Sequence, residues 1–87
     1  MHALRFTSDN PLDHLPRALD QLRRMGFRIH RAALEEAAAA GEASVRLIFS
    51  CDSTGAAETF RHRVEGLMGV SDLALYAVAE EPDRACA

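Results

Sequence analysis

The spacing of apolar side chains predicts a short strand followed by an amphipathic helix at the start of the chain. Within residues 3–7, Leu4 and Phe6 alternate with small or polar residues, which is the period of a half-buried strand. After a turn-rich stretch, leucines recur every three or four positions, the period of one helix face. These leucines are Leu12, Leu15, Leu19 and Leu22. Gly26 is suited to end the helix in the left-handed conformation.

The start of this helix depends on Pro16. A proline in a helix interior is unfavourable by about 3 kcal/mol, whereas the first turn does not need its missing N–H group. We therefore expect Asp13 rather than Asn10 to be the N-cap. This choice leaves residues 8–12 as a loop of about five residues.

Residues 27–40 admit two interpretations. The stretch from Phe27 to His30 reads as the beginning of a second strand. The alanine-rich residues 31–40 have high helix propensity and precede Gly41, which fits a helix with a glycine C-cap. Alternatively, residues 31–35 continue the strand and residues 36–42, from Glu36 to Glu42, form a hairpin tip. Local propensity does not decide between them, because tertiary context routinely overrides it.

The second half of the chain predicts strand, helix and strand. In residues 44–51, Val45, Leu47, Phe49 and Cys51 alternate with Ser44, Arg46, Ile48 and Ser50, so we expect a central strand. Ser53 is a natural N-cap for a helix that runs to about Met68. Its apolar positions are Ala57, Phe60, Val64 and Leu67. Residues 73–78 are an apolar final strand.

The predicted order is strand, helix, strand, strand, helix, strand. This order is typical of the α+β ferredoxin-like βαββαβ fold, a four-stranded antiparallel sheet with two helices on one face. We expect one domain over residues 1–79 and a flexible C-terminal tail over residues 80–87, because 87 residues leave no room for two cores. We also expect the uncovered sheet face to be apolar, and therefore a homodimer.

Charge and composition exclude several kinds of protein. The net charge is −3, and only four Phe and one Tyr are present, so we expect no binding to nucleic acid. All ten basic residues are arginine, which excludes lysine chemistry. No apolar run approaches the ~20 residues that span a bilayer, so we expect no membrane association. Cys51 and Cys86 suggest no disulfide framework, and we expect reduced thiols in a cytoplasmic protein.

No arrangement of side chains predicts catalysis or metal binding. Cys51 lies near Asp52 and Ser53, but His62 is too far along the following helix to act as its base, so we expect Cys51 to be a small core residue. The four histidines lack metal-ligand spacing, and we expect them to be solvated. They are His2, His14, His30 and His62. The arginines Arg23, Arg24, Arg28 and Arg31 are interpreted as a solvated face, and the alternative is an interface, since arginine is enriched at interfaces and binds carboxylates with two hydrogen bonds. We therefore expect a protein that is not an enzyme.

Two stretches of the sequence resemble a known protein family. Residues 11–15, Leu19 and Leu22, followed by Gly26-Phe27-Arg28-Ile29, resemble the ACT-domain pattern, in which a proline-opened loop and helix precede a Gly-x-Asn-Ile strand. Residues 24–29 with the alanine-rich segment, together with residues 53–75, are similar to the short, single-ACT regulatory subunits of acetolactate synthase. The resemblance covers residues 3–78. It favours the hairpin over the helix at residues 31–40, because that family closes a strand-strand hairpin there.

The resemblance implies a function. It implies a non-enzymatic regulatory subunit that associates with a thiamine-dependent acetolactate synthase large subunit in branched-chain amino-acid biosynthesis and modulates it. That large subunit would hold thiamine diphosphate, magnesium and flavin, so we expect no cofactor on this chain. The alternative is a stand-alone ACT-like sensor that binds an amino acid and regulates another protein.

The resemblance also implies an effector site between subunits. An amino-acid carboxylate, such as that of a branched-chain amino acid, would meet the start of the first helix, where free N–H groups favour an anion. The residues there are Asn10, Pro11, Leu12 and Asp13, and those closing the site from a neighbouring subunit are Gly26, Phe27, Arg28 and Ile29. Leu12 replaces the usual glycine and Arg28 the usual asparagine. We therefore expect weak binding, near millimolar, or none.

Overall fold

Six elements make up the computed structural model, which describes residues 1–36 and 41–78. In chain order they are β1 (His2–Ser8), α1 (Pro11–Arg24), β2 (Arg28–Glu36), β3 (Ala43–Ser50), α2 (Thr54–Glu65) and β4 (Val70–Ala77). This is the predicted order of strands and helices. The predicted tail, residues 80–87, lies outside the described residues.

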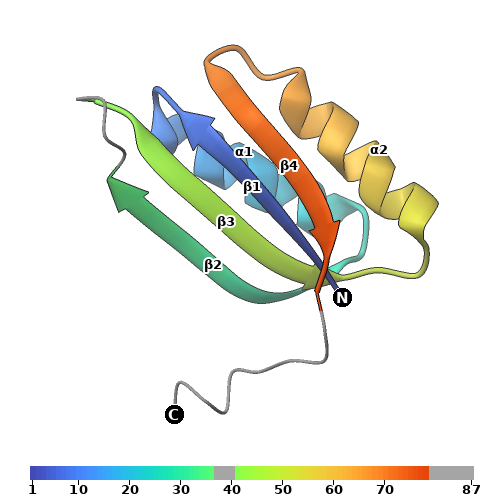
Figure 1. The fold of residues 1–87 in the computed structure, drawn as a ribbon. Coiled ribbons are helices and arrows are strands. Elements are labelled where there is room, and N and C mark those ends of the chain that lie inside the picture. Colours follow the sequence, from blue (N-terminus) through green and yellow to red (C-terminus); the bar gives the residue numbers. More distant parts are fainter. Residues whose placement is uncertain (37–40, 79–87) are drawn as a thin grey trace, which may run out of the picture.

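The four strands form one antiparallel sheet in the order β2-β3-β1-β4 (Figure 1). The central strands β1 and β3 place Leu4 opposite Leu47 and Phe6 opposite Val45. These side chains are fully buried and pack with residues of both helices, so the two helices cover the same face of the sheet. The predicted ferredoxin-like fold is confirmed.

The centre of the core is an aromatic cluster around Phe49. Its ring is fully buried and stacks on Phe27 with the ring centroids 5.5 Å apart. Phe60 from α2 meets the same ring edge to face at 5.1 Å. Aromatic pairs prefer these two geometries, which add to the gain from burying their area. The cluster therefore joins β3, α2 and the segment that follows α1.

The hairpin prediction for residues 31–35 is confirmed. Strand β2 pairs with β3, with Arg31 opposite Ile48 and Glu35 opposite Ser44. Glu36 pairs with Ala43 and so belongs to the strand, not to the tip as predicted. The rest of the predicted tip includes residues 37–40, which lie outside the described residues. Ladder hydrogen bonds with a buried neighbouring strand outweigh the helix propensity of the alanines.

The predicted start of the first helix is wrong. Helix α1 begins at Pro11, and Asn10 rather than Asp13 is its N-cap. The Asn10 carbonyl accepts hydrogen bonds from the N–H groups of Asp13 and His14, at 3.0 and 2.9 Å. Pro11 occupies the first helical position, where its fixed φ favours the helix. Pro16 then lies inside the helix and removes a bond to the carbonyl of Leu12, a residue that is 87% exposed.

Two further boundaries differ from the predictions. Helix α2 begins as expected, with the Ser53 hydroxyl accepting from the Ala56 N–H, but it ends at Glu65 instead of about Met68. Gly66 caps it, since glycine loses most entropy in a helix. Strand β4 begins at Val70 instead of residue 73, because Val70 and Ser71 pair with the end of β1 before a bulge.

The expectation of an apolar uncovered face is wrong. The side chains there include the pair Arg5 and Arg46, together with Thr7 and Ser44, while Ile48 and Ala3 are buried beside them. The polar positions of β1 and β3 alternate with core leucines and phenylalanines, so they must point away from the helices. In the part of the chain that the structure describes, no helix is long and apolar enough to cross a membrane.

Candidate functional site

The predicted site residues form two groups at opposite ends of α1. Asn10, Pro11, Leu12 and Asp13 surround its start, and Gly26, Phe27, Arg28 and Ile29 follow its end. A helix of 14 residues is about 21 Å long at ~1.5 Å per residue. One chain therefore does not bring the two groups together.

The start of α1 offers few free N–H groups for an anion. Pro11 has none, and the N–H groups of Asp13 and His14 are bonded to the Asn10 carbonyl. The Asn10 N–H donates to the Ser8 hydroxyl at 3.0 Å. Among the described residues this leaves the Leu12 N–H without a recorded acceptor, beneath a leucine side chain exposed to solvent. A carboxylate approaching the helix would meet one donor and an apolar side chain.

His14 is a buried residue beside the predicted site, and the sequence does not predict its burial. It was expected to be solvated, but it is only 4% exposed. Its Nδ1 lies 2.6 Å from the Ser8 hydroxyl, and its Nε2 lies 2.7 Å from the Met68 carbonyl oxygen. The sequence around a single histidine in a helix does not indicate whether its side chain is buried. The one available hint is that His14 falls on the buried side of α1 once the helix starts at Pro11.

These contacts fix the hydrogen positions on the neutral His14 ring. A carbonyl can only accept, so Nε2 carries the hydrogen and donates it to Met68. Nδ1 then accepts from the Ser8 hydroxyl, whose oxygen accepts in turn from the Asn10 N–H. This chain of bonds joins the end of β1, the start of α1 and the loop before β4. It holds the predicted carboxylate-binding loop in one conformation.

A close approach between Asp9 and Gly69 reinforces the same corner. The Asp9 N–H donates to the Gly69 carbonyl at 3.1 Å. Gly69 has φ +95°, and a Cβ atom placed on it would overlap the Asp9 carboxylate. Glycine is therefore required here both for its backbone conformation and for the space above it.

Gly69→Ala should lower the free energy of unfolding by at least about 1 kcal/mol, because the backbone is strained for any L residue and the Cβ displaces Asp9. Gly55→Ala is the matched control. A Cβ there would meet the Ser53 hydroxyl at an ordinary 3.8 Å, so stability should be unchanged or slightly raised. Urea unfolding monitored by circular dichroism measures both. Equal stability of the two variants would contradict the assigned role of Gly69.

The second group of predicted residues borders a shallow polar hollow. Gly26 has φ +76° and directs the chain from α1 into β2, while Phe27 is anchored on Phe49. Arg28 and Ile29 remain exposed. The hollow has a volume of about 200 Å³ and is lined by Met25, Gly26, Phe27, Arg28, Ser50, Cys51 and Asp52. A ligand there would meet the Arg28 guanidinium and the Asp52 carboxylate, which are charges of opposite sign.

Cys51 packs against the core at this end of the molecule, in agreement with its expected role. Its thiol donates to the Ser53 carbonyl at 3.2 Å, and its nearest histidine is His2, with Nδ1 3.7 Å from the sulfur. His62 instead lies 3.6 Å from Glu65 on α2. Within residues 1–36 and 41–78, no three His, Cys, Asp or Glu side chains gather closely enough to hold a metal ion.

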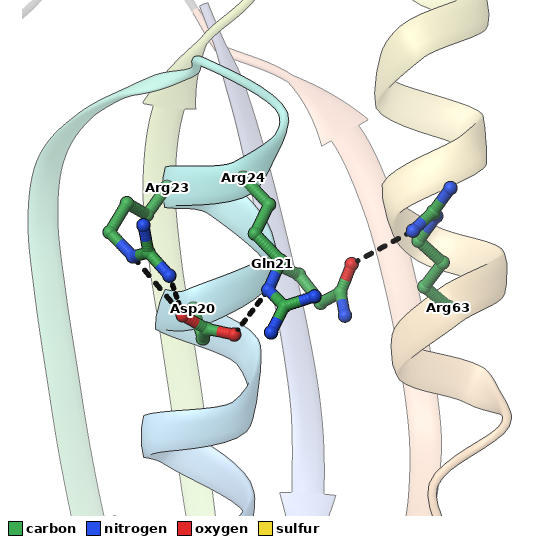
Figure 2. Close-up of polar contacts among 5 residues, drawn as sticks. All are labelled: Asp20, Gln21, Arg23, Arg24 and Arg63. Atoms are coloured by element: carbon green, nitrogen blue, oxygen red, sulfur yellow. Dashed lines mark hydrogen bonds and ion pairs between the residues drawn. The ribbon is translucent and has the colours of Figure 1, made fainter.

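The four arginines of the predicted solvated face separate into two places. Arg23 and Arg24 both bind Asp20 on α1, at 2.6 and 2.7 Å, and Gln21 beside them accepts from Arg63 of α2 (Figure 2). The hydrogen bond from Arg23 lowers the pKa of Asp20, desolvation opposes this, and Arg24 lowers it further. Arg28 and Arg31 lie on β2 instead.

Comparisons with known proteins identify the fold. No protein-family model matches the sequence, and no curated protein matches it. The ACT domain of a GTP pyrophosphokinase from Chlorobium tepidum superposes with a TM-score of 0.70 at 13% identity, covering 86% of this chain and 95% of that domain. The C-terminal domain of the MgtC protein from Mycobacterium tuberculosis gives 0.75 at 10% identity, covering 91% and 92%.

A third solved structure is much longer than this chain. Formyltetrahydrofolate deformylase from Burkholderia mallei gives a TM-score of 0.68 at 15% identity, with 93% of this chain matching 29% of that enzyme. At these identities the comparisons show a shared fold. The chain therefore has the ferredoxin-like fold of ACT domains, and its activity and partners have to be argued from its own residues.

Proposed function

We propose that this chain is a non-catalytic regulatory module that binds an amino acid between two copies of itself and controls a partner enzyme. The proposal rests mainly on the direction of β2 at the sheet edge. Strand β2 starts where α1 ends and finishes beside the start of α1, because Glu36 pairs with Ala43 and Ala43 pairs with Ser8. If two copies paired antiparallel through β2, the Gly26–Ile29 segment of one would approach residues 10–13 of the other.

The edge of β2 has the properties of a surface that another strand could cover. It is a nine-residue edge strand, and long unpaired edges readily pair with another chain. On the helix side of β2, Ile29 and Leu34 are 42% and 43% exposed because α1 does not cover them fully. Pairing with a second β2 would bury part of this apolar surface.

A bound amino acid would be held weakly in this arrangement. Its carboxylate would face the start of α1, which favours an anion, but it would find the Leu12 N–H as the available donor. The exposed Leu12 side chain also stands between the ligand and the backbone. We expect a dissociation constant on the order of 1 mM, which corresponds to about −4 kcal/mol.

Leu12→Gly should tighten the binding of valine, leucine or isoleucine, because the backbone of α1 becomes accessible to the carboxylate. Isothermal titration calorimetry on the unmodified chain and on the variant measures the change. Leu12→Ala is the matched control, since it removes the bulk without the added freedom of glycine. It should give an intermediate affinity.

Two results would contradict the proposed site. Heat from none of the proteins would mean that the chain does not bind branched-chain amino acids. Tight binding by the unmodified chain would mean that Leu12 does not obstruct the ligand.

The partner enzyme we propose is the large subunit of a thiamine-dependent acetolactate synthase. The support is the resemblance of residues 24–29 and 53–75 to the short regulatory subunits of that enzyme. Assays of the purified large subunit with and without this chain should show a change in synthase activity. Amino-acid binding without any effect on the synthase would favour the stand-alone sensor instead.

A further inference from the structure

Two arginines face each other on the side of the sheet that neither α1 nor α2 covers. Arg5 of β1 lies directly opposite Arg46 of β3 in the antiparallel register, and both are exposed. Neither has an ion pair or a side-chain hydrogen bond with any residue that the structure describes. Like charges directly opposite each other destabilise a sheet, and an anionic partner would relieve this repulsion.

Two carboxylates flank the arginines, one toward each edge of the sheet. Glu35 lies on β2 and Asp72 on β4, and neither has an ion pair within the described residues. Glu35 borders a hollow of about 270 Å³ together with Arg46, and Asp72 borders a second hollow of about 410 Å³. Arg5 and Ser44 line both hollows. In the two rows that hold these four residues, the charges across the sheet therefore run negative, positive, positive, negative, and Arg31 of β2 lies one row further on the same face, opposite Ile48.

The same residues form a ridge beside a groove. Arg46 and Arg5 make one row across the two central strands, and the next row, two residues along each strand, consists of Ser44 and Thr7. Rows on one face are separated by about 6.6 Å, since each residue advances a strand by ~3.3 Å. On these two strands long side chains fill the first row and short ones the second, and the two hollows are bordered by residues of both rows.

We infer that this face binds the same face of a second copy of the chain. The two copies are related by a two-fold axis that lies between the two sheets and is perpendicular to their strands. Such an axis sets the arginine row of each copy over the Ser44 and Thr7 row of the other. Arg46 then reaches Glu35 of the second copy, and Arg5 reaches Asp72 of the second copy. A two-fold interface repeats both pairs, so four ion pairs form and the ridge of each copy fills the groove of the other.

The charge pattern discriminates against other occupants of this face. A two-fold axis parallel to the strands would instead place Arg46 against Arg5 of the second copy, and these like charges would repel each other. An acidic peptide would neutralise the arginines but would be repelled by Glu35 and Asp72. A second copy supplies both signs in the required order.

The predicted contact is small. Four strands ~4.8 Å apart and about 25 Å long give about 500 Å² per copy, or about 1,000 Å² in total. This is the lower limit for a specific interface, so we expect weak, reversible association that salt reduces. The contact uses side chains of the uncovered face, including Glu35 of β2, and not the free backbone groups at the β2 edge, so the inference does not rest on the proposed function.

A charge exchange between variants tests the pairing. Arg46→Glu should weaken self-association at least about tenfold at low salt, because the introduced carboxylate would face Glu35 of the second copy. Glu35→Arg should weaken it similarly by setting two arginines together. An equimolar mixture of the two variants should associate as the unmodified chain does, because each heterodimer regains oppositely charged pairs. Sedimentation equilibrium measures the association, and circular dichroism verifies folding.

Arg63→Glu on α2 is the control, since it makes the same change of net charge on the helix side and should leave the association unchanged. The inference is overturned if the unmodified chain stays monomeric at all concentrations. It is also overturned if Arg46→Glu associates like the unmodified chain, or if the mixture associates no better than either variant. The charge-exchange results can fail while the proposed effector site stands, because Arg46→Glu leaves the backbone edge of β2 unchanged, whereas a chain that is monomeric at all concentrations would overturn both proposals.

Discussion

Phe49→Ala should lower the free energy of unfolding by about 3–5 kcal/mol, the range for removing a buried aromatic ring. Phe49 is fully buried and contacts both Phe27 and Phe60, so truncation removes two ring pairs and leaves a cavity between β3 and α2. The total stability of a small domain is ~5–15 kcal/mol, so the variant should lose a large share of its stability. Urea denaturation followed by far-UV circular dichroism provides the measurement.

Phe49→Leu is the control for this prediction. It keeps a buried apolar side chain but loses the ring contacts, so its stability should lie between those of Phe49→Ala and the unmodified chain. If Phe49→Ala lost less than about 1 kcal/mol, the ring could not occupy the packed position that the structure gives it.

His14→Ala should be the second most damaging substitution, with an expected loss of about 3 kcal/mol. Leaving a buried polar group unsatisfied costs about 1–3 kcal/mol, and the variant leaves the buried Ser8 O–H without its acceptor, removes the bond to the Met68 carbonyl and empties the space of a buried ring. Hydrogen exchange should also accelerate at the Asp9 amide, because its bond to Gly69 depends on the same corner staying closed. Denaturation and exchange measurements test the two effects separately.

A double-mutant cycle separates the hydrogen-bond chain from simple packing. Ser8→Ala removes the hydroxyl that joins His14 to the Asn10 N–H. Residues in one hydrogen-bond network show coupling energies of about 0.5–3 kcal/mol, so the double variant should lose less than the sum of the single losses. Additive losses would indicate that the two side chains do not act together.

If His14 holds the start of α1 as we infer, its loss should also weaken amino-acid binding at that loop. Leu12→Gly acts on access to the backbone, whereas His14→Ala acts on the order of the same loop. A variant carrying both changes should therefore bind less tightly than Leu12→Gly alone. Calorimetry with valine, leucine and isoleucine would show the difference.

The sequence was sufficient to predict the strands and helices and their order. Each of them buries one side against the same core, and this leaves a periodic pattern of apolar residues in the sequence. Alternation in β1 and β3, and spacings of three and four in both helices, identify the sides that become buried. Leu4, Leu47 and Phe60 lie inside as those periods require. Helix propensity alone would have misassigned β2, and the family resemblance, not the periodicity, decided in favour of the hairpin.

The boundaries were less predictable, because they depend on competition between local preferences. Pro16 argued for a later helix start, yet the combination of Pro11 at the first helical position and an exposed Leu12 tolerates a proline within the helix. Similarly, β4 gains three residues from pairing with the end of β1, which the sequence of β4 does not encode by itself.

For the candidate site, the sequence determined which residues flank the ends of the first helix, since those follow from the order of the elements. Only the tertiary structure decided that His14 is buried, because its partners Ser8 and Met68 come from other parts of the chain. It also decided that Arg5 meets Arg46, because strand register sets which side chains lie opposite each other. Local sequence controls periodicity and turns, whereas contacts between distant segments exist only once the sheet has formed.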